Sequence, residues 1–258
     1  AKESRDTDVI NIDPRSHLEV CDPKHRYAKN LRLYYEEWER TQKFRVDDGG
    51  ISFFEWLDSS SAPNLSGCPR KALNEDTVMY ITNEEERLQY AIRIDSKGLL
   101  HSHTGTLLTT NNGGWIVVLQ NDQLYGNPKV TDRYPRFHHS SFFSGQPVQF
   151  AGLITCTEGR LKCVFPHSGH YRPSERHLCN MLCWLQVKLP PEIFAGVLVD
   201  AQRVLHITRR IDTDGSKVAK KDMAVFWNAV YMADFLRVKQ EAWRSYGLFS
   251  EMCDVMCN

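Results

Sequence analysis

The sequence lacks any long, uninterrupted apolar run. Its longest apolar stretches are broken by Gln, Asp or Arg, whereas a helix that crosses a bilayer needs about 18 or more apolar residues in succession. The opening residues 1–6 are too polar for a secretory signal peptide. We therefore expect no membrane-spanning segment and no membrane as a partner.

The chain also lacks net charge, because 32 basic residues balance 32 acidic ones. This balance offers no overall electrostatic footprint for nucleic acid, so we expect no nucleic-acid partner. Hydrophobic residues make up 41% and charged residues 25% of the 258 residues, as in ordinary globular proteins. A chain of this length buries about three quarters of the surface that its unfolded form exposes, and we expect it to fold without disulfides.

Cysteine is too sparse for a disulfide scaffold, with eight residues spread along the chain. Reduced thiols in the cytosol or the nucleus are the expected state. Cys179 and Cys183, like Cys253 and Cys257, stand four residues apart, which would place both thiols of a pair on one helix face. Such a pair can serve a metal, but a small buried hydrophobe is the commoner role, and we predict no metal ligand.

The familiar nucleotide and hydrolase motifs are missing. The chain has no P-loop, no G-x-G-x-x-G, no H-E-x-x-H and no G-x-S-x-G. Asp212–Ser216 resembles the start of a calcium loop, but its twelfth position holds Met223 instead of an acidic ligand. The sequence therefore identifies no cofactor, and the cofactor is unknown at this stage.

The hydrophobic pattern predicts an α+β fold, a mostly antiparallel sheet flanked by helices with a helical C-terminal extension. Helical spacing or capping residues mark five segments, at 24–40, 51–57, 83–87, 174–185 and from 217 onward. Apolar or alternating runs predict strands at 90–94, 99–101, 115–119, 148–155 and 161–165, with one or two more within 193–211. The run at 115–119 is apolar throughout, which is typical of a strand buried on both faces.

Two imidazoles and two hydroxyls stand side by side in residues 137–142, Phe-His-His-Ser-Ser-Phe. In an extended conformation His138 would face one way, while His139 and Ser141 face the other. One of these faces would then line a cleft, where a His transfers protons near neutral pH and a nearby Ser acts as nucleophile or orienter. The alternative is a buried hydrogen-bond network with no catalytic role.

A second His-containing run occupies residues 168–173, Ser-Gly-His-Tyr-Arg-Pro, between a predicted strand and a predicted helix. Loops at the end of a sheet often carry functional sites. His170 is a second acid or base candidate, Tyr171 completes the candidate set, and Arg172 can hold a phosphate or a carboxylate. The alternative is structural, with Tyr171 packed in the core and Arg172 paired with a carboxylate.

The C-terminal segment offers a candidate partner site. Phe226, Val230 and Phe235 follow the 1-5-10 spacing of helical calmodulin targets, with basic residues on both sides. The alternative is that so apolar a helix packs on its own domain.

Several motifs, taken in order, resemble the IQM family of calmodulin-binding proteins of plants and fungi, which is also likened to heavy-metal-induced proteins. The resemblance covers residues 24–188. Its motifs are His25-Arg26-Tyr27, Tyr34-Tyr35-Glu36-Glu37-Trp38, Phe53-Phe54-Glu55-Trp56-Leu57-Asp58, Cys68-Pro69-Arg70, Trp115-Ile116-Val117-Val118, Ala151-Gly152 and the two His-containing runs.

The hydrophobic pattern and the resemblance together predict a domain organisation, and the resemblance implies a partner. Residues 1–22 would be an irregular lead-in, residues 23–211 an IQM-like α+β domain, and residues 212–258 a helical extension packed on that domain. Calmodulin is implied as the partner by kinship alone, because the chain contains no I-Q-x-x-x-R-G motif.

Three functions stay open, and the one with the least support from residue spacing is a metal-responsive protein that uses its ten histidines and eight cysteines. The first is a calmodulin-linked regulatory protein in cytoplasmic or nuclear signalling, with a cleft formed by the two His-containing runs. The second is an enzyme that uses the same cleft, a hydrolase or a group transferase such as an ADP-ribosyltransferase-like protein. A looser resemblance to bacterial toxin-associated domains, which carry a similar pairing of His-containing runs, favours the second.

Overall fold

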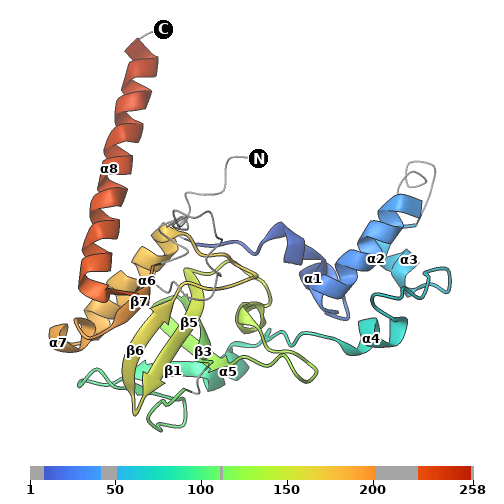
Figure 1. Ribbon diagram of the computed structural model, residues 1–258, viewed down its shortest axis with the longest axis horizontal. Coiled ribbons are helices and arrows are strands. Elements are labelled where there is room, and N and C mark those ends of the chain that lie inside the picture. The colour runs from blue at the N-terminus through green and yellow to red at the C-terminus, as the bar shows by residue number, and fades with distance from the viewer. Residues whose placement is uncertain (1–8, 42–50, 111–112, 202–225, 257–258) are drawn as a thin grey trace, which may run out of the picture.

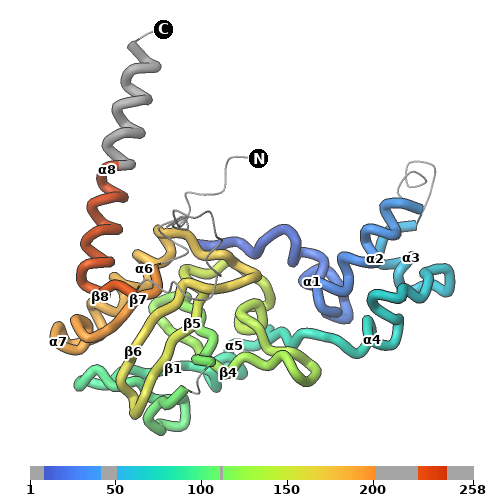
Figure 2. Tube along the Cα trace, viewed as in Figure 1, coloured from blue at the N-terminus to red at the C-terminus, as the bar shows by residue number. Residues whose placement is uncertain are grey.

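The computed structural model describes residues 9–41, 51–110, 113–201 and 226–256, with side chains up to residue 242. A curved sheet forms the main body, a lobe of short helices lies to one side of it, and a long helix rises from the other side (Figure 1). Two segments connect the body with the lobe. One includes α1 (His17–Cys21), and the other joins α4 (Arg70–Glu75) to α5 (Glu84–Arg87) (Figure 2).

Eight strands form one sheet in the order β2-β1-β4-β3-β5-β6-β7-β8 within the described residues. Every neighbouring pair is antiparallel except β6 and β7, which are parallel. The strands are β1 (Ala91–Ile94), β2 (Leu100–His101), β3 (Trp115–Gln120), β4 (Gln123–Pro128), β5 (Phe150–Thr157), β6 (Arg160–Phe165), β7 (Leu198–Asp200) and β8 (Phe226–Asn228).

Strand β3 lies at the centre of the sheet and is buried on both faces. Val117 and Leu119 belong to a cluster with α6 (Glu175–Lys188) and the first half of α8 (Ala229–Met256). Ile116 and Val118 point the other way, into a second cluster that includes Phe142. Alternate residues of a strand face opposite sides, so the continuous apolar run predicted here is explained by two cores that share one strand.

The helices follow local signals in the sequence. Helix α2 (Ala28–Thr41) buries an aromatic and aliphatic face, and α3 (Phe53–Asp58) begins after Ser52, whose backbone N–H donates to the Glu55 carboxylate. Asn83 caps α5 by accepting from the Glu85 N–H. The remaining short elements are η1 (Pro14–Ser16), η3 (Leu88–Tyr90), η4 (His139–Phe143) and α7 (Pro191–Phe194).

The helical lobe has an apolar core of its own. Its buried members come from α2, α3, α4 and the loop between α3 and α4, and they form a cluster separate from both clusters of the sheet body. Buried residues of this lobe core are Leu31, Tyr34, Trp38, Phe53, Trp56, Leu57, Ala62, Cys68 and Leu73.

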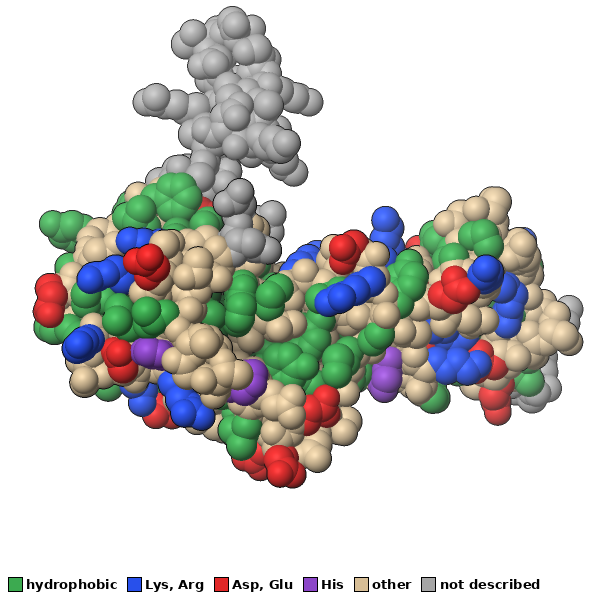
Figure 3. All heavy atoms as spheres, turned by 90° about the horizontal axis from the view of Figure 1, so that it is seen from below, with side chains coloured by type: hydrophobic (Ala, Val, Ile, Leu, Met, Phe, Trp, Pro, Cys, Tyr) green, Lys and Arg blue, Asp and Glu red, His purple; other side chains and the backbone are tan. Residues whose placement is uncertain are grey.

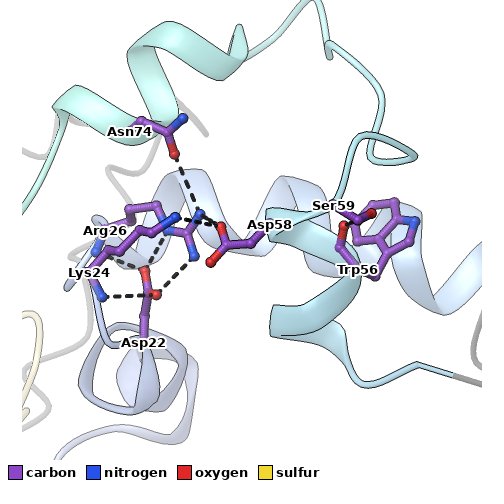
Figure 4. A network of polar contacts seen from close by, with 7 residues as sticks. All are labelled: Asp22, Lys24, Arg26, Trp56, Asp58, Ser59 and Asn74. Atoms are coloured by element: carbon purple, nitrogen blue, oxygen red, sulfur yellow. Dashed lines mark hydrogen bonds and ion pairs between the residues drawn. The ribbon is translucent and has the colours of Figure 1, made fainter.

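A fully buried arginine ties the lobe together (Figure 4). The Arg26 guanidinium donates to both oxygens of Asp22, at 2.6 and 2.9 Å, and to Asp58 at 2.7 Å. Asp22 is itself fully buried, directly after α1, while Asp58 ends α3. One side chain therefore fixes the position of α1 relative to α3.

The structure confirms the predicted fold class, an α+β protein with a mostly antiparallel sheet, flanking helices and a C-terminal helix. Among the described residues, no helix combines the length and the apolar character that a bilayer crossing requires.

Three local predictions differ from the structure. The described part of the lead-in at 1–22 is not irregular, since it contains η1 and α1. Residues 139–143 form the 3₁₀ turn η4 instead of an extended segment, because the Ser141 hydroxyl accepts the His138 N–H and so favours a turn. Phe226 lies on β8, paired with Asp200 of β7, and not on a helix. Residues 202–225, which include the calcium-like segment and part of the predicted strands, lie outside the described chain.

We expect Arg26→Ala to lower the free energy of unfolding by about 3–5 kcal/mol, because it leaves the Asp22 carboxylate buried without its cation. Urea denaturation of the whole chain measures this change. Arg40→Ala is the matched control in the same lobe, since Arg40 pairs with Glu37 at 2.7 Å on the surface. The control should leave the denaturation midpoint nearly unchanged. Equal midpoints for both variants would contradict the structural role of Arg26.

Candidate functional site

A cavity of about 440 Å³ lies between the sheet body and the helical lobe. Its lining comes from η1, the start of α2, strands β3 and β5, and the two His-containing runs. The lining residues are Asp13, Arg15, Ser16, Tyr27, Ala28, Lys29, Arg32, Ile116, Lys129, Thr131, His138, His139, Leu153, His167, Ser168, Gly169, His170 and Arg172. The structure thus places four of the predicted site residues, His138, His139, His170 and Arg172, on one concave surface.

A buried carboxylate stands behind the two imidazoles of His138 and His170. Glu19 of α1 is 0% exposed. Its Oε1 accepts the Tyr80 hydroxyl at 2.7 Å, its Oε2 accepts the Ala28 N–H at 3.0 Å, and the Ser140 hydroxyl lies 3.4 Å from Oε1. Burial raises the pKa of Tyr80, and the adjacent Glu19 carboxylate raises it further, so this phenol stays protonated as a donor.

His138 and His170 approach each other and Glu19. Their ring centroids lie 5.1 Å apart, and His170 Nε2 is 3.3 Å from Glu19 Oε1. The His138 ring also packs edge-on against Tyr27 at 5.5 Å. Burial, with the nearby His170 as a smaller cause, lowers the pKa of His138 to about 2. His138 is therefore a neutral imidazole at physiological pH.

His139 points into the sheet body from η4. Its Nε2 donates to the Gly152 carbonyl of β5 at 2.7 Å, and burial lowers the pKa of His139 to about 3. A residue as small as glycine is needed at position 152, since a Cβ there would lie 2.6 Å from the Phe150 ring. This hydrogen bond anchors η4 on the sheet. An imidazole with so low a pKa stays neutral near pH 7, so His139 is better suited to this structural role than to proton transfer.

Ser141 and Tyr171 do not line the cavity. The Ser141 hydroxyl accepts the His138 N–H at 2.9 Å and is fully buried. The Tyr171 hydroxyl donates to the Gln146 carbonyl at 2.8 Å, and burial raises the pKa of Tyr171. These contacts position the two His-containing runs. Ser141 holds the backbone of His138, and Tyr171 holds the loop that carries His170.

The lining of the cavity is rich in cations. Arg172 pairs with Asp13 at 3.0 Å, and Arg15 pairs with the same carboxylate at 2.9 Å. Among the described residues, no carboxylate lies within 4 Å of Lys29 or Lys129. On the face seen in Figure 3, basic and acidic side chains are scattered together.

The candidate partner residues at the C-terminus do not share one helix. Phe226 belongs to β8, whereas Val230 and Phe235 belong to α8. Val230 is partly buried and packs against the core of the sheet body. The ring centroids of Phe235 and Trp227 lie 5.6 Å apart. The 1-5-10 spacing therefore does not form a single helical face.

Glu19 and Tyr80 could not be predicted from the sequence, because both lie in segments without a periodic pattern and act through tertiary contacts. For Lys29 and Arg32 the sequence indicated only an exposed position, since they occupy the polar face of the predicted helix at 24–40. Cys179 and Cys183 do share a face of α6, with 3.9 Å between their sulfurs, away from the cavity lining.

Known proteins resemble this chain over its middle part. The family described as "IQ motif-containing protein middle domain" matches residues 86–178. The IQ domain-containing protein IQM5 of Arabidopsis thaliana is 36% identical over 186 residues, which cover 70% of this chain and 36% of that protein. IQM3 of the same plant is 37% identical over 176 residues, 66% of this chain and 36% of that protein. No solved structure matches.

These matches place the middle part of the chain among the IQ-domain proteins. The chain belongs to the IQM family, and residues 86–178 are its IQM middle domain. It spans about a third of the length of the curated relatives that it matches.

We expect the stability of the protein to fall as the pH falls from about 6.5 toward 3, because the unfolded His139 binds a proton in this window and the folded one does not. His139→Gln, which keeps an N–H donor without a titrating ring, should reduce the slope of unfolding free energy against pH by roughly 1 kcal/mol per unit between pH 6 and 5. Urea denaturation across that range measures the slope. His103→Gln, at an exposed position, is the control; an equal slope in both variants would contradict the role given to His139.

Proposed function

We propose that this chain is the ligand-binding part of a calmodulin-linked regulatory protein of the IQM type, and that its cavity holds a small anionic molecule. The observation that carries the proposal is the meeting of the two His-containing runs at one cavity with a largely cationic set of charged lining residues. The runs lie about thirty positions apart in the sequence, so their meeting at one cavity is a product of the fold.

Charge supports an anionic ligand. Five basic residues line the cavity against one acidic residue, Asp13, and the basic residues are Arg15, Lys29, Arg32, Lys129 and Arg172. Asp13 pairs with Arg15 and Arg172, and Arg32 pairs with Glu36 at 3.7 Å. Among the described residues, this leaves Lys29 and Lys129 as the lining cations without an ion pair. A concave, partly enclosed surface strengthens their attraction for an anion, because it holds less water than an open surface does.

The test is calorimetric titration of the whole chain with inorganic pyrophosphate. The double variant Lys29→Ala and Lys129→Ala should weaken binding at least about tenfold, since a charge about 4 Å from an anion contributes about 1 kcal/mol in water. Lys162→Ala is the control, because Lys162 is exposed on β6 and outside the cavity lining. Binding that is equal in the double variant and the control would count against the anion site.

An enzyme is the second candidate for the same cavity. The observation in its favour is the contact of His170 Nε2 with Glu19 Oε1 at 3.3 Å, because a carboxylate that orients an imidazole is a recurring part of acid–base sites. The same titration separates the two candidates. Release of free phosphate from pyrophosphate, with continuing heat, supports hydrolysis, whereas binding without release supports the ligand-binding function.

Calmodulin enters the proposal through the IQM family, and α8 is the segment of this chain that suits it best. Tyr231, Phe235 and Val238 lie four and three positions apart and therefore share one face of the helix. Tyr231 is 73% and Val238 67% exposed. Arg237 and Lys239 lie beside this stripe, and a basic amphipathic helix is the usual calmodulin target.

Pull-down of the whole chain with calmodulin tests this partner, with and without calcium. We expect binding in calcium that the double variant Tyr231→Glu and Val238→Glu weakens at least about tenfold, which corresponds to 1.4 kcal/mol of lost apolar contact. Val187→Glu is the matched control, since Val187 is an apolar residue 81% exposed on α6. Retained binding by the double variant would exclude α8 as the calmodulin site.

A further inference from the structure

Glu19, His138 and His170 come together from three distant parts of the chain, with the two imidazoles lining the cavity and the buried Glu19 carboxylate behind them. Glu19 lies on α1, His138 just before η4, and His170 in the loop after β6. Each offers one ligand atom, and the three atoms lie within 4.8 Å of one another. We propose that these three side chains bind one divalent transition-metal ion, with the remaining coordination positions open to the cavity.

The distances suit such an ion after a small adjustment. Ligand atoms around a tetrahedral ion with bonds of about 2.0–2.1 Å lie about 3.3 Å apart. His170 Nε2 and Glu19 Oε1 are already 3.3 Å apart. The ligand atoms of the three side chains lie within 4.8 Å of one another, so a shift of about 1.5 Å or less brings them to the spacing of a tetrahedral ion.

Two buried imidazole nitrogens without a hydrogen-bond partner give independent support for a metal ion at this position. The Nδ1 of His138 is buried and has no hydrogen-bond partner, and His170 Nε2 is buried without a hydrogen bond of good geometry, although it lies near Glu19. Buried polar atoms are normally paired, and exceptions need a reason. His138 as a whole is only 3% exposed, so bulk water does not satisfy its ring.

The carboxylate needs a cation for the same reason. Glu19 is fully buried, its neutral donors are Tyr80, Ala28 and Ser140, and no Lys or Arg lies within 4 Å of it in the described chain. Burial of an ionised carboxylate without a cation is costly. These donors also hold the carboxylate in one orientation, as the outer partners of metal-binding carboxylates do.

Two imidazole nitrogens and one carboxylate oxygen are the donor set of zinc and iron(II) sites with three protein ligands. His138 and His170 line the cavity, so a molecule there would reach the open positions of the ion. An ion so placed acts as a Lewis acid on a bound anion or lowers the pKa of bound water. The metal site stands on the triad's own geometry and does not depend on anion or calmodulin binding.

The test uses the whole chain, purified without a metal-affinity step, treated with a chelator and then titrated with Zn²⁺ and Co²⁺. We expect one ion per chain at micromolar concentration or below, and a Co²⁺ visible spectrum of a site with low coordination number. His138→Gln and His170→Gln should weaken binding at least about 100-fold. The control is His167→Gln, because His167 lines the same cavity but pairs with Asp200 at 3.0 Å outside the triad.

A gain-of-signal variant keeps the proposal testable if the glutamine variants unfold. His170→Cys retains a ligand atom, and a thiolate on Co²⁺ adds an intense charge-transfer band in the near ultraviolet. The band should appear in His170→Cys and be absent from His167→Cys. The proposal is overturned if the unaltered chain binds neither ion, if His167→Gln weakens binding as much as the triad variants do, or if folded His170→Cys shows no band with Co²⁺.

Discussion

The burial of the Glu19 carboxylate is the constraint that organises this molecule. An ionised group at 0% exposure must find its partners within the protein, and those partners come from four other segments. They are the start of α2, the segment after α4, η4 and the loop after β6. Satisfying one carboxylate therefore places the helical lobe, the two His-containing runs and the cavity in fixed relation to one another.

The apolar cores determine the architecture on either side of that point. On the sheet body, β3 supplies residues to both faces, and α6 and α8 cover one of them. In the lobe, Arg26 forms ion pairs with Asp22 and Asp58, and the apolar core is a separate one rich in aromatic residues. Burial of apolar side chains stabilises each body, whereas hydrogen bonds and ion pairs fix the orientation of the two bodies relative to each other.

Much of the fold was visible in the sequence, and the reasons for the exceptions are physical. The strands at 115–119, 148–155 and 161–165 were predictable because their side chains alternate or remain apolar over a full element. Phe226 was misjudged because an aromatic residue suits a strand and a helix equally well, and pairing with β7 decided between them. The extended form expected at 138–141 gave way to a turn because a serine hydroxyl competes for a backbone N–H.

The candidate site was predictable only in part. The two His-containing runs stood out by their composition, and the fold brings them to one cavity. Glu19 could not be found in this way, since its segment is polar and unpatterned and its burial depends on Tyr80 and His170, which are far away in the sequence. The contacts of Glu19 with Tyr80 and His170 form only in the folded chain, so the residues around Glu19 show no periodic pattern that would predict them.

The joint between the lobe and the sheet body is polar, and this affects how the protein unfolds. Asp76 binds Arg136 across it, Tyr80 binds Glu19, and Val78 forms a single bridge with Arg136, while the apolar cores on its two sides remain separate. Two bodies with their own cores melt as one unit only to the extent that the joint couples them. The cavity lies at this joint, so a ligand that contacts both bodies there adds to their coupling and makes their unfolding more cooperative.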